Sequence, residues 1–140
     1  HENGELPMVF EEGRIKDIFM AQKCFSYQKI PRLYVITETD DLYAIQSDSS
    51  YFYITSGIPE SVEKVVDFGV KKIISLSPME FLLSTDGVMY YRTSSVVNMG
   101  GYGITEASEE FVPLYTRHRF DDITYCRLAN TIVATIKEEE

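Results

Sequence analysis

One histidine stands among charged residues in an arrangement that could support acid–base chemistry. His118 lies between Arg117 and Arg119, and Asp121 and Asp122 follow closely, so a general-base pair can be drawn from this group. No serine or cysteine in a nucleophile motif lies nearby, and such a base needs a positioned nucleophile to act upon. We therefore interpret the group as a solvated loop cluster, and the sequence predicts no catalytic residue.

Acidic groups and a glycine-rich stretch are the remaining candidates for ligand chemistry. None of the acidic groups has the alternating oxygen-ligand spacing of a calcium loop; they are Asp40-Asp41, Glu109-Glu110 and Glu138 to Glu140. The stretch from Gly100 to Gly103 lacks the Lys-Ser/Thr pair and the strand-to-helix setting of a phosphate loop, so we expect a turn there. The sequence thus predicts no metal-binding and no cofactor-binding residue.

Tyrosines are the residues that we expect to contact a partner. Side chains alternate between the two faces of a strand, so in each aromatic group one side is expected to face the core and the other can present a ring for recognition. The predicted partner-binding residues are Tyr51, Tyr53, Tyr90, Tyr91 and Tyr102. The alternative interpretation is that these aromatic groups serve the core alone.

The elements that would position these residues are short strands. Between Val70 and Arg92, runs of β-branched, aromatic and bulky residues are bounded by Pro78 and by Asp86-Gly87, which favours strands over a helix. We expect a strand over residues 72–76 and a hairpin of residues 81–84 with 88–91. Asp86-Gly87 predicts a two-residue type I′ turn, in which both residues have a positive φ.

Similar runs occur on both sides of this stretch and predict an array of related units. They begin at Ile15, Val70 and Phe120, which is a period of roughly 50 residues with several strands per unit, as in propeller arrays. The predicted fold class is all-β, with antiparallel hairpin or meander units arranged as consecutive blades of a partial β-propeller. We expect an N-terminal arm over residues 1–13 and a β domain over residues 14–140, with units at about 14–57, 58–112 and 113–140.

Length and charge limit the classes of partner. The 140 residues correspond to about one domain, and the formal net charge of −9 disfavours binding to nucleic acid or to an anionic membrane, so a basic protein surface is the easier match. No apolar run is long enough to span a bilayer. Cys24 and Cys126 are expected to be buried unpaired thiols, which favours an intracellular location, cytoplasmic or nuclear.

The central unit resembles the repeats of the regulator of chromosome condensation family. The residues that carry the resemblance are Val70-Lys71-Lys72-Ile73, Leu83 to Tyr90 around Asp86-Gly87, Asn98, the glycines of Gly100 to Gly103, and Pro113. The resemblance covers about two and a half repeats. Tyr91-Arg92 stand where the family has Trp-Gly, so this would be a divergent member. The resemblance implies a β-propeller of four-stranded blades, usually seven, and hence either a fragment, a chain completed by partners, or a different assembly of three units.

The repeated strands and the missing catalytic constellation together predict a non-enzymatic protein–protein interaction module. The resemblance implies a first alternative, a guanine nucleotide exchange factor for a small GTPase. An unrelated small β-fold enzyme or ligand-binding protein is a second alternative. The partner is then another protein, either a small GTPase or a larger parent chain. An unfinished repeat exposes strand edges, so we also expect self-association, docking on a further segment, or strand donation by the arm at Glu2 to Phe10.

Overall fold

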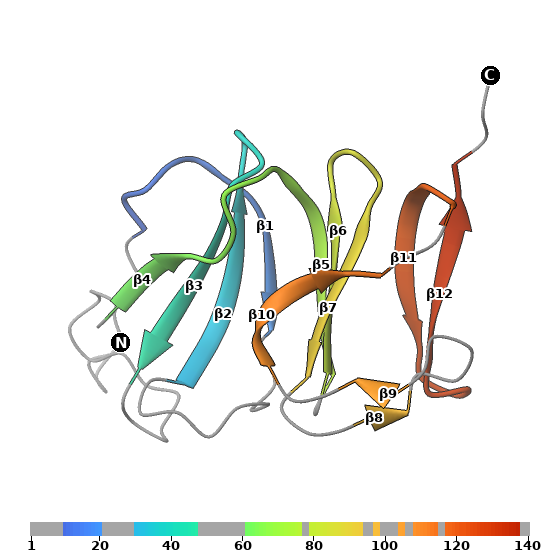
Figure 1. Cartoon of the computed structure of the whole chain (residues 1–140). Helices are drawn as coiled ribbons and strands as arrows, with labels where there is room; N and C mark the ends of the chain where they lie inside the picture. Colours follow the sequence, from blue (N-terminus) through green and yellow to red (C-terminus); the bar gives the residue numbers. More distant parts are fainter. Residues whose placement is uncertain are drawn as a thin grey trace.

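The chain forms antiparallel sheets, and the prediction of an all-β fold is confirmed. The computed structural model describes residues 10–20, 30–47, 61–76, 79–93, 97–98, 104–105, 108–114 and 117–137. Three sheets stand side by side in chain order, as Figure 1 shows. Each successive strand within the first sheet pairs antiparallel with the next, so the sheet is a meander.

The first two sheets each contain four strands, and the third contains two. The first sheet has the order β1-β2-β3-β4, with β1 Ile15–Met20, β2 Ile30–Thr37, β3 Leu42–Ser47 and β4 Ser61–Lys64. The second has the order β10-β7-β6-β5, with β5 Val70–Leu76, β6 Met79–Ser84, β7 Met89–Thr93 and β10 Ser108–Pro113. The third consists of β11 Phe120–Cys126 and β12 Thr131–Ile136. A small hairpin of β8 Val97–Asn98 and β9 Ile104–Thr105 lies between β7 and β10 in the chain.

The core lies between the faces of neighbouring sheets. Alternate residues of the first sheet, such as Tyr34 and Ile36, are buried against Ile73 and Leu82 of the second sheet. A second cluster joins the second and third sheets through Leu83, Met89, Phe120 and Ile123. Burial of apolar side chains on both faces of the second sheet explains why the apolar runs of β5 and β6 are nearly continuous.

The turn at Asp86-Gly87 is not the predicted type I′ turn. Only Gly87 has a positive φ, at 85°. The amide of Gly87 donates to the Ser84 carbonyl (3.0 Å), and the amide of Ser84 donates to the Val88 carbonyl (2.9 Å). The loop therefore holds three residues, with glycine in the left-handed position that closes a bulged turn. The Ser84 hydroxyl accepts the Val88 amide at 3.1 Å, and this bond stabilises the longer loop.

Three structural details recur between the sheets. The turn between the second and third strands has one residue with a positive φ in each of the first two sheets, namely Asp40 and Gly87. Each first strand has an irregular register near its start, at Ile15/Asp17, Val70/Lys72 and Phe120/Asp122. The first strand of one sheet also binds the preceding turn, because the amide of Val70 donates to Asp40 and the amide of Phe120 donates to Gly87, both at 2.8 Å.

The outer strands β4 and β10 were not anticipated from the sequence. The acidic sequence of residues 106–110 favours a loop or a helical turn, but this expectation is wrong for residues 108–110, which begin β10. Both strands are short and carry charged residues, as edge strands often do, and such residues weaken the usual pattern of a strand. The aromatic run over residues 51–55, whose composition favours a strand, lies outside the described residues, as do Tyr102 and residues 1–9 of the arm. Tyr51 and Tyr53 belong to this run.

Candidate functional site

A row of three polar residues crosses the second sheet on the face that packs against the first sheet. Ser75 of β5 pairs with Glu80 of β6, and Glu80 pairs with Arg92 of β7. The same face carries Ile73 and Leu82 in the core. Glu80 is only 1% exposed, and a carboxylate at such a position requires hydrogen-bond donors on all sides.

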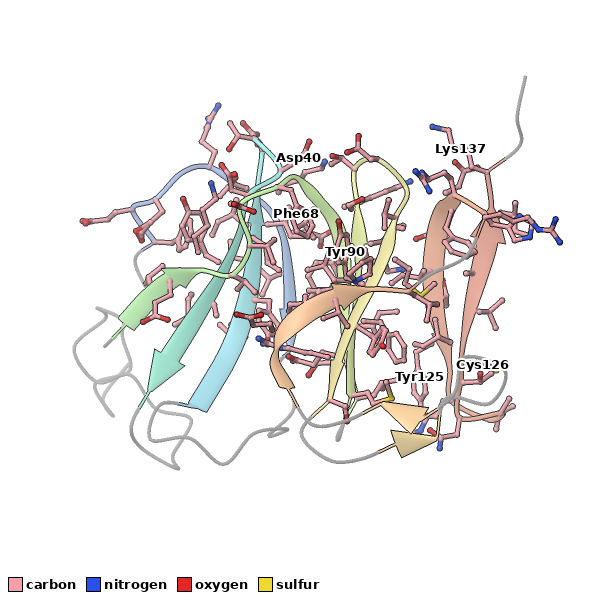
Figure 2. The ribbon with its side chains drawn as sticks, in the orientation of Figure 1. Asp40, Phe68, Tyr90, Tyr125, Cys126 and Lys137 are labelled. Carbon is pink, nitrogen blue, oxygen red and sulfur yellow. The ribbon has the colours of Figure 1, made fainter. Side chains whose placement is uncertain are left out.

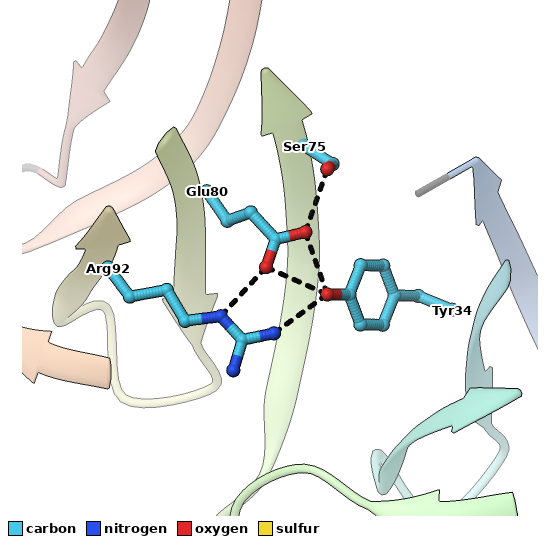
Figure 3. A network of polar contacts seen from close by, with 4 residues as sticks. All are labelled: Tyr34, Ser75, Glu80 and Arg92. Carbon is cyan, nitrogen blue, oxygen red and sulfur yellow. Dashed lines mark hydrogen bonds and ion pairs between the residues drawn. The ribbon is translucent and has the colours of Figure 1, made fainter. Parts of the chain in front are cut away.

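Tyr34 of β2 reaches across from the first sheet and completes a network around Glu80 (Figure 3). Its hydroxyl lies 2.8 and 2.7 Å from the two carboxylate oxygens. Ser75 donates to Oε2 at 2.7 Å, and the Nε atom of Arg92 donates to Oε1 at 2.7 Å. A terminal nitrogen of Arg92 also donates to the Tyr34 hydroxyl at 2.8 Å. The network therefore fastens the two sheets together through polar atoms.

The ionisation of these groups follows from their burial. Burial, and then the Glu80 carboxylate, raise the pKa of the Tyr34 phenol far above its usual value, so Tyr34 acts as a neutral donor and acceptor. Burial alone would lower the pKa of Arg92, but its contacts with Tyr34 and Glu80 outweigh burial and the pKa is raised. Arg92 is thus a fixed cation with two of its nitrogens engaged.

The other side of Arg92 meets an aromatic ring from the outer strand. The guanidinium carbon lies 4.3 Å from the centre of the Phe111 ring, a cation–π distance. Phe111 belongs to an irregular part of β10, because Ser108 pairs with Thr93 while Val112 pairs with Tyr91. A bulge re-aims side chains locally, and this one places Glu110 and Phe111 opposite Arg92.

A surface cavity of about 510 Å³ opens beside this stack. Its walls come from the end of β4 and the following connection, from β7 and from β10, and the lining residues are Lys64, Val65, Val66, Asp67, Phe68, Arg92, Glu110 and Phe111. The volume falls within the range of sites that bind small ligands or side chains. Because Arg92 belongs to both the network and the cavity wall, the core fixes the shape of this site.

Neither of the two described tyrosines of the predicted partner-binding set lines the cavity, although Tyr90 contacts Phe68 of its wall. Tyr90 is half-buried and packs against the first core cluster, with its ring stacked on Phe68 at a centroid distance of 4.6 Å. Phe68 and Tyr90 lie together between the first two sheets in Figure 2. Tyr91 is half-buried and pairs with Phe81 and Val112 on the neighbouring strands. Tyr51, Tyr53 and Tyr102 lie outside the described residues, so a recognition role for these tyrosines stays a prediction.

The charged residues near His118 are exposed and lie where the third sheet contacts the second. His118 is exposed just before β11. The Asp121 carbonyl accepts from Lys71, and Asp122 forms an ion pair with Lys72 at 3.4 Å. These bonds join the third sheet to the second. Cys126 is a half-buried free thiol, while Cys24 lies outside the described residues.

Sequence reasoning did not identify the residues of the network and cavity. One indication was present, because Glu80 interrupts an apolar run in the sequence Met79 to Leu83, and a charged residue there requires a buried partner. A second was Arg92, which stands where the resembling repeats have glycine. The partner of Glu80, Tyr34, lies 46 residues away in the chain, and no local pattern specifies such a pair.

Among the described residues, no group of three or more His, Cys, Asp or Glu is arranged to hold a metal ion. The same part of the chain has no helix with the length and apolar character needed to cross a bilayer. Comparison of the chain with protein-family models, curated proteins and solved structures gives no match. The resemblance to regulator of chromosome condensation repeats therefore stays a prediction.

Proposed function

We propose that this chain is a non-enzymatic protein–protein interaction module formed by consecutive blades of a partial β-propeller. The observation that carries the proposal is the recurrence of one arrangement in the three sheets. The irregular register of β1, β5 and β11 recurs, and so does the bond from the next first strand to the preceding turn. Sheets related in this way are typical of propeller blades.

The order of the strands agrees with this interpretation. In the first two sheets the first strand in the chain lies at one edge and the last lies at the other. The first strands come close to one another, since β5 contacts both β1 and β11. In a propeller the first strands likewise converge and the outer strands diverge, which leaves grooves between neighbouring blades.

The cavity beside Arg92 supports an interaction role. It opens between the outer parts of two neighbouring sheets, where β4 ends and β10 begins to bend. Half-buried aromatic rings, Phe68 and Phe111, line it beside charged side chains. A pocket with aromatic walls and a charged rim has the anatomy of a protein-binding hot spot.

A peptide selection tests the proposal. A phage-displayed library of random twelve-residue peptides is selected on the immobilised 140-residue chain, and each enriched peptide is then measured against two double variants. Asp67→Arg/Glu110→Arg places two long cations at the mouth of the cavity. Glu38→Arg/Asp86→Arg makes the same change of charge at exposed turn residues.

We expect the enriched peptides to lose binding to the cavity variant and to keep binding to the turn variant. Circular dichroism of both variants establishes that the sheets are intact. The proposal fails when no peptide is enriched, or when the enriched peptides bind the cavity variant as well as they bind the unmodified chain.

A further inference from the structure

We propose that β12 pairs antiparallel with β12 of a second copy of this chain, in a register centred on Val133. The contact joins the two-stranded third sheets of the two copies into one sheet of four strands, which is the number in the first and second sheets. None of the residues of β12 lines the cavity, so the contact lies on a different surface and does not depend on the proposed function.

The free edge of β12 differs in composition from the other sheet edges of the described chain. β12 lies at the end of the row of sheets (Figure 1), and among the described residues β11 is the one strand that pairs with it. Charged side chains discourage an edge strand from pairing with another chain. They occur on each of the other edge strands longer than two residues, namely β1, β4, β5, β10 and β11. β12 reads Thr-Ile-Val-Ala-Thr-Ile and has none, so its edge is open to another strand.

Exposed apolar side chains gather on the hairpin that β12 forms with β11. Six large apolar side chains are exposed among the described residues, and three of them belong to this hairpin, namely Leu128, Val133 and Ile136. Val133 and Ile136 lie on β12 itself. A contact along this strand would remove apolar surface from water, which favours association.

The backbone of β12 presents hydrogen-bonding groups at its free edge. The amide of Lys137, just after the strand, donates toward β11 to the Arg119 carbonyl at 2.8 Å. Because the bonding direction alternates along an antiparallel strand, the amide of Val133 also points toward β11, and those of Ile132 and Ala134 point away from it. Val133 is therefore a non-hydrogen-bonded position for an added strand, where opposing side chains approach most closely.

The order of residues in β12 matches a second, antiparallel β12. With Val133 at the centre, Val133 meets Val133, Thr131 meets Thr135, and Ile132 meets Ala134 of the other copy. Each pair joins residues of one face, since Thr131, Val133 and Thr135 are exposed while Ile132 and Ala134 are half-buried toward the second core cluster. A register shifted by one residue would set core-facing side chains against exposed ones. Threonine pairs and β-branched pairs across strands are favourable, so the strand is complementary to itself.

The charges that flank β12 favour antiparallel over parallel pairing. In the sequence, Arg127 precedes the strand and Glu138 to Glu140 follow it. An antiparallel pair brings the start of one strand beside the end of the other, so opposite charges of the two copies come together, whereas a parallel pair would bring like charges together. No carboxylate lies between Cys126 and Lys137. The acidic residues behind the net charge of −9 thus lie outside the paired strand, and salt screens their repulsion.

Sedimentation velocity at a series of concentrations tests the contact in the 140-residue chain. The unmodified chain should associate to a dimer and no further, because a two-fold contact closes on itself. Val133→Lys sets two like charges against each other at the two-fold axis and should weaken dimerisation by at least about tenfold. Ile18→Lys is the matched control, because Ile18 lies on the edge strand β1 and is 52% exposed, close to the 55% of Val133. This control should dimerise as the unmodified chain does, and circular dichroism establishes that both variants keep their sheets.

Cysteine cross-linking tests the register independently. In a chain with Cys24→Ser and Cys126→Ser, Val133→Cys should form a disulfide between copies under mild oxidation, because the two cysteines face each other across the axis. Thr131→Cys in the same background would lie four residues, or about 13 Å, from its counterpart. That separation is too long for a disulfide, so Thr131→Cys should cross-link at least about tenfold more slowly.

The results that would overturn the proposal are distinct from those that concern the cavity. A monomer at millimolar concentration overturns it, and so does dimerisation of Val133→Lys as tight as that of Ile18→Lys. Growth beyond a dimer also overturns it, as does cross-linking of Thr131→Cys at the rate of Val133→Cys. Peptides that depend on the cavity should bind Val133→Lys as tightly as the unmodified chain, so the proposed function stands even where this contact fails.

Discussion

Replacement of Arg92 should destabilise the chain far more than replacement of an exposed cation. In Arg92→Leu, the Glu80 carboxylate stays 1% exposed and keeps only the donors Tyr34 and Ser75. Leaving one member of a buried ion pair without its counter-ion costs about 3–5 kcal/mol. This is a large fraction of the roughly 5–15 kcal/mol that separates native from unfolded protein in a typical domain.

The coupling between Glu80 and Arg92 separates this explanation from a simple loss of packing. Glu80→Gln alone removes the charge from a hydrogen bond to Arg92, which costs about 1.5–3 kcal/mol. The double variant Glu80→Gln/Arg92→Leu contains neither charge, so nothing ionised is stranded in the core. The free energy of unfolding of the double variant should therefore be about 1–3 kcal/mol higher than it would be if the losses in the two single variants simply added.

Urea unfolding followed by far-ultraviolet circular dichroism measures these free energies, and equal m-values establish that the variants unfold in the same way. Lys16→Met is the matched control, because Lys16 and Asp40 form an exposed ion pair at 2.9 Å that should contribute about 1 kcal/mol or less. Arg92→Lys keeps the charge and should lose about 1–2 kcal/mol, since lysine cannot reach Glu80 and Tyr34 together with one planar group. Additive effects of the two single variants, within about 0.5 kcal/mol, would refute the reasoning.

Four further predictions concern pH, a turn, activity and assembly. Because the pKa of Tyr34 is raised in the native state, the contribution of Tyr34 to stability is complete below pH 10, and above pH 10 it should fall by about 1.4 kcal/mol per pH unit. Urea unfolding at a series of pH values measures this fall, and a free energy of unfolding that falls equally steeply with pH in Tyr34→Phe would contradict the prediction. Gly87→Ala should cost about 1–3 kcal/mol in urea unfolding, since φ is +85° and the new Cβ would lie 3.0 Å from the Phe120 carbonyl oxygen, whereas an effect no larger than that of Asp86→Ala would count against the turn assignment. Catalytic amounts of the chain should not accelerate nucleotide release from small GTPases, and acceleration would favour the exchange-factor alternative. Sedimentation velocity should show association that increases with concentration, and a monomer at every concentration would exclude it.

Local sequence patterns were sufficient to predict the central strands. The β-branched and aromatic runs that begin at Ile15, Val70 and Phe120 form β1, β5 and β11. β5 begins at Val70, two residues before the strand expected over residues 72–76. The hairpin expected from residues 81–84 and 88–91 forms as β6 and β7, within a few residues of these bounds. These strands contribute most of the buried apolar residues, and a strong hydrophobic pattern follows from burial.

The outer strands and the exact turn could not be predicted in the same way. β4 reads Ser-Val-Glu-Lys, and β10 begins with Ser-Glu-Glu, so neither has a continuous apolar run. Their conformation depends on pairing with β3 and β7, which is a tertiary effect. The turn at Gly87 differs from expectation because the Ser84 hydroxyl binds the Val88 amide, and this bond selects a loop of three residues over one of two.

The buried network explains why the stability of this fold and the shape of its cavity are not independent. Arg92 binds Glu80 and Tyr34 in the interior and stacks on Phe111 at the surface. A substitution of Glu80 or Tyr34, which the structure places away from the cavity lining, would therefore release the guanidinium from its fixed position beside Phe111. Peptide binding should weaken in Tyr34→Phe even under conditions where the sheets remain folded. In that variant the Arg92 side chain would become ordered only when the peptide binds, and the entropy lost in this ordering would reduce the free energy of binding.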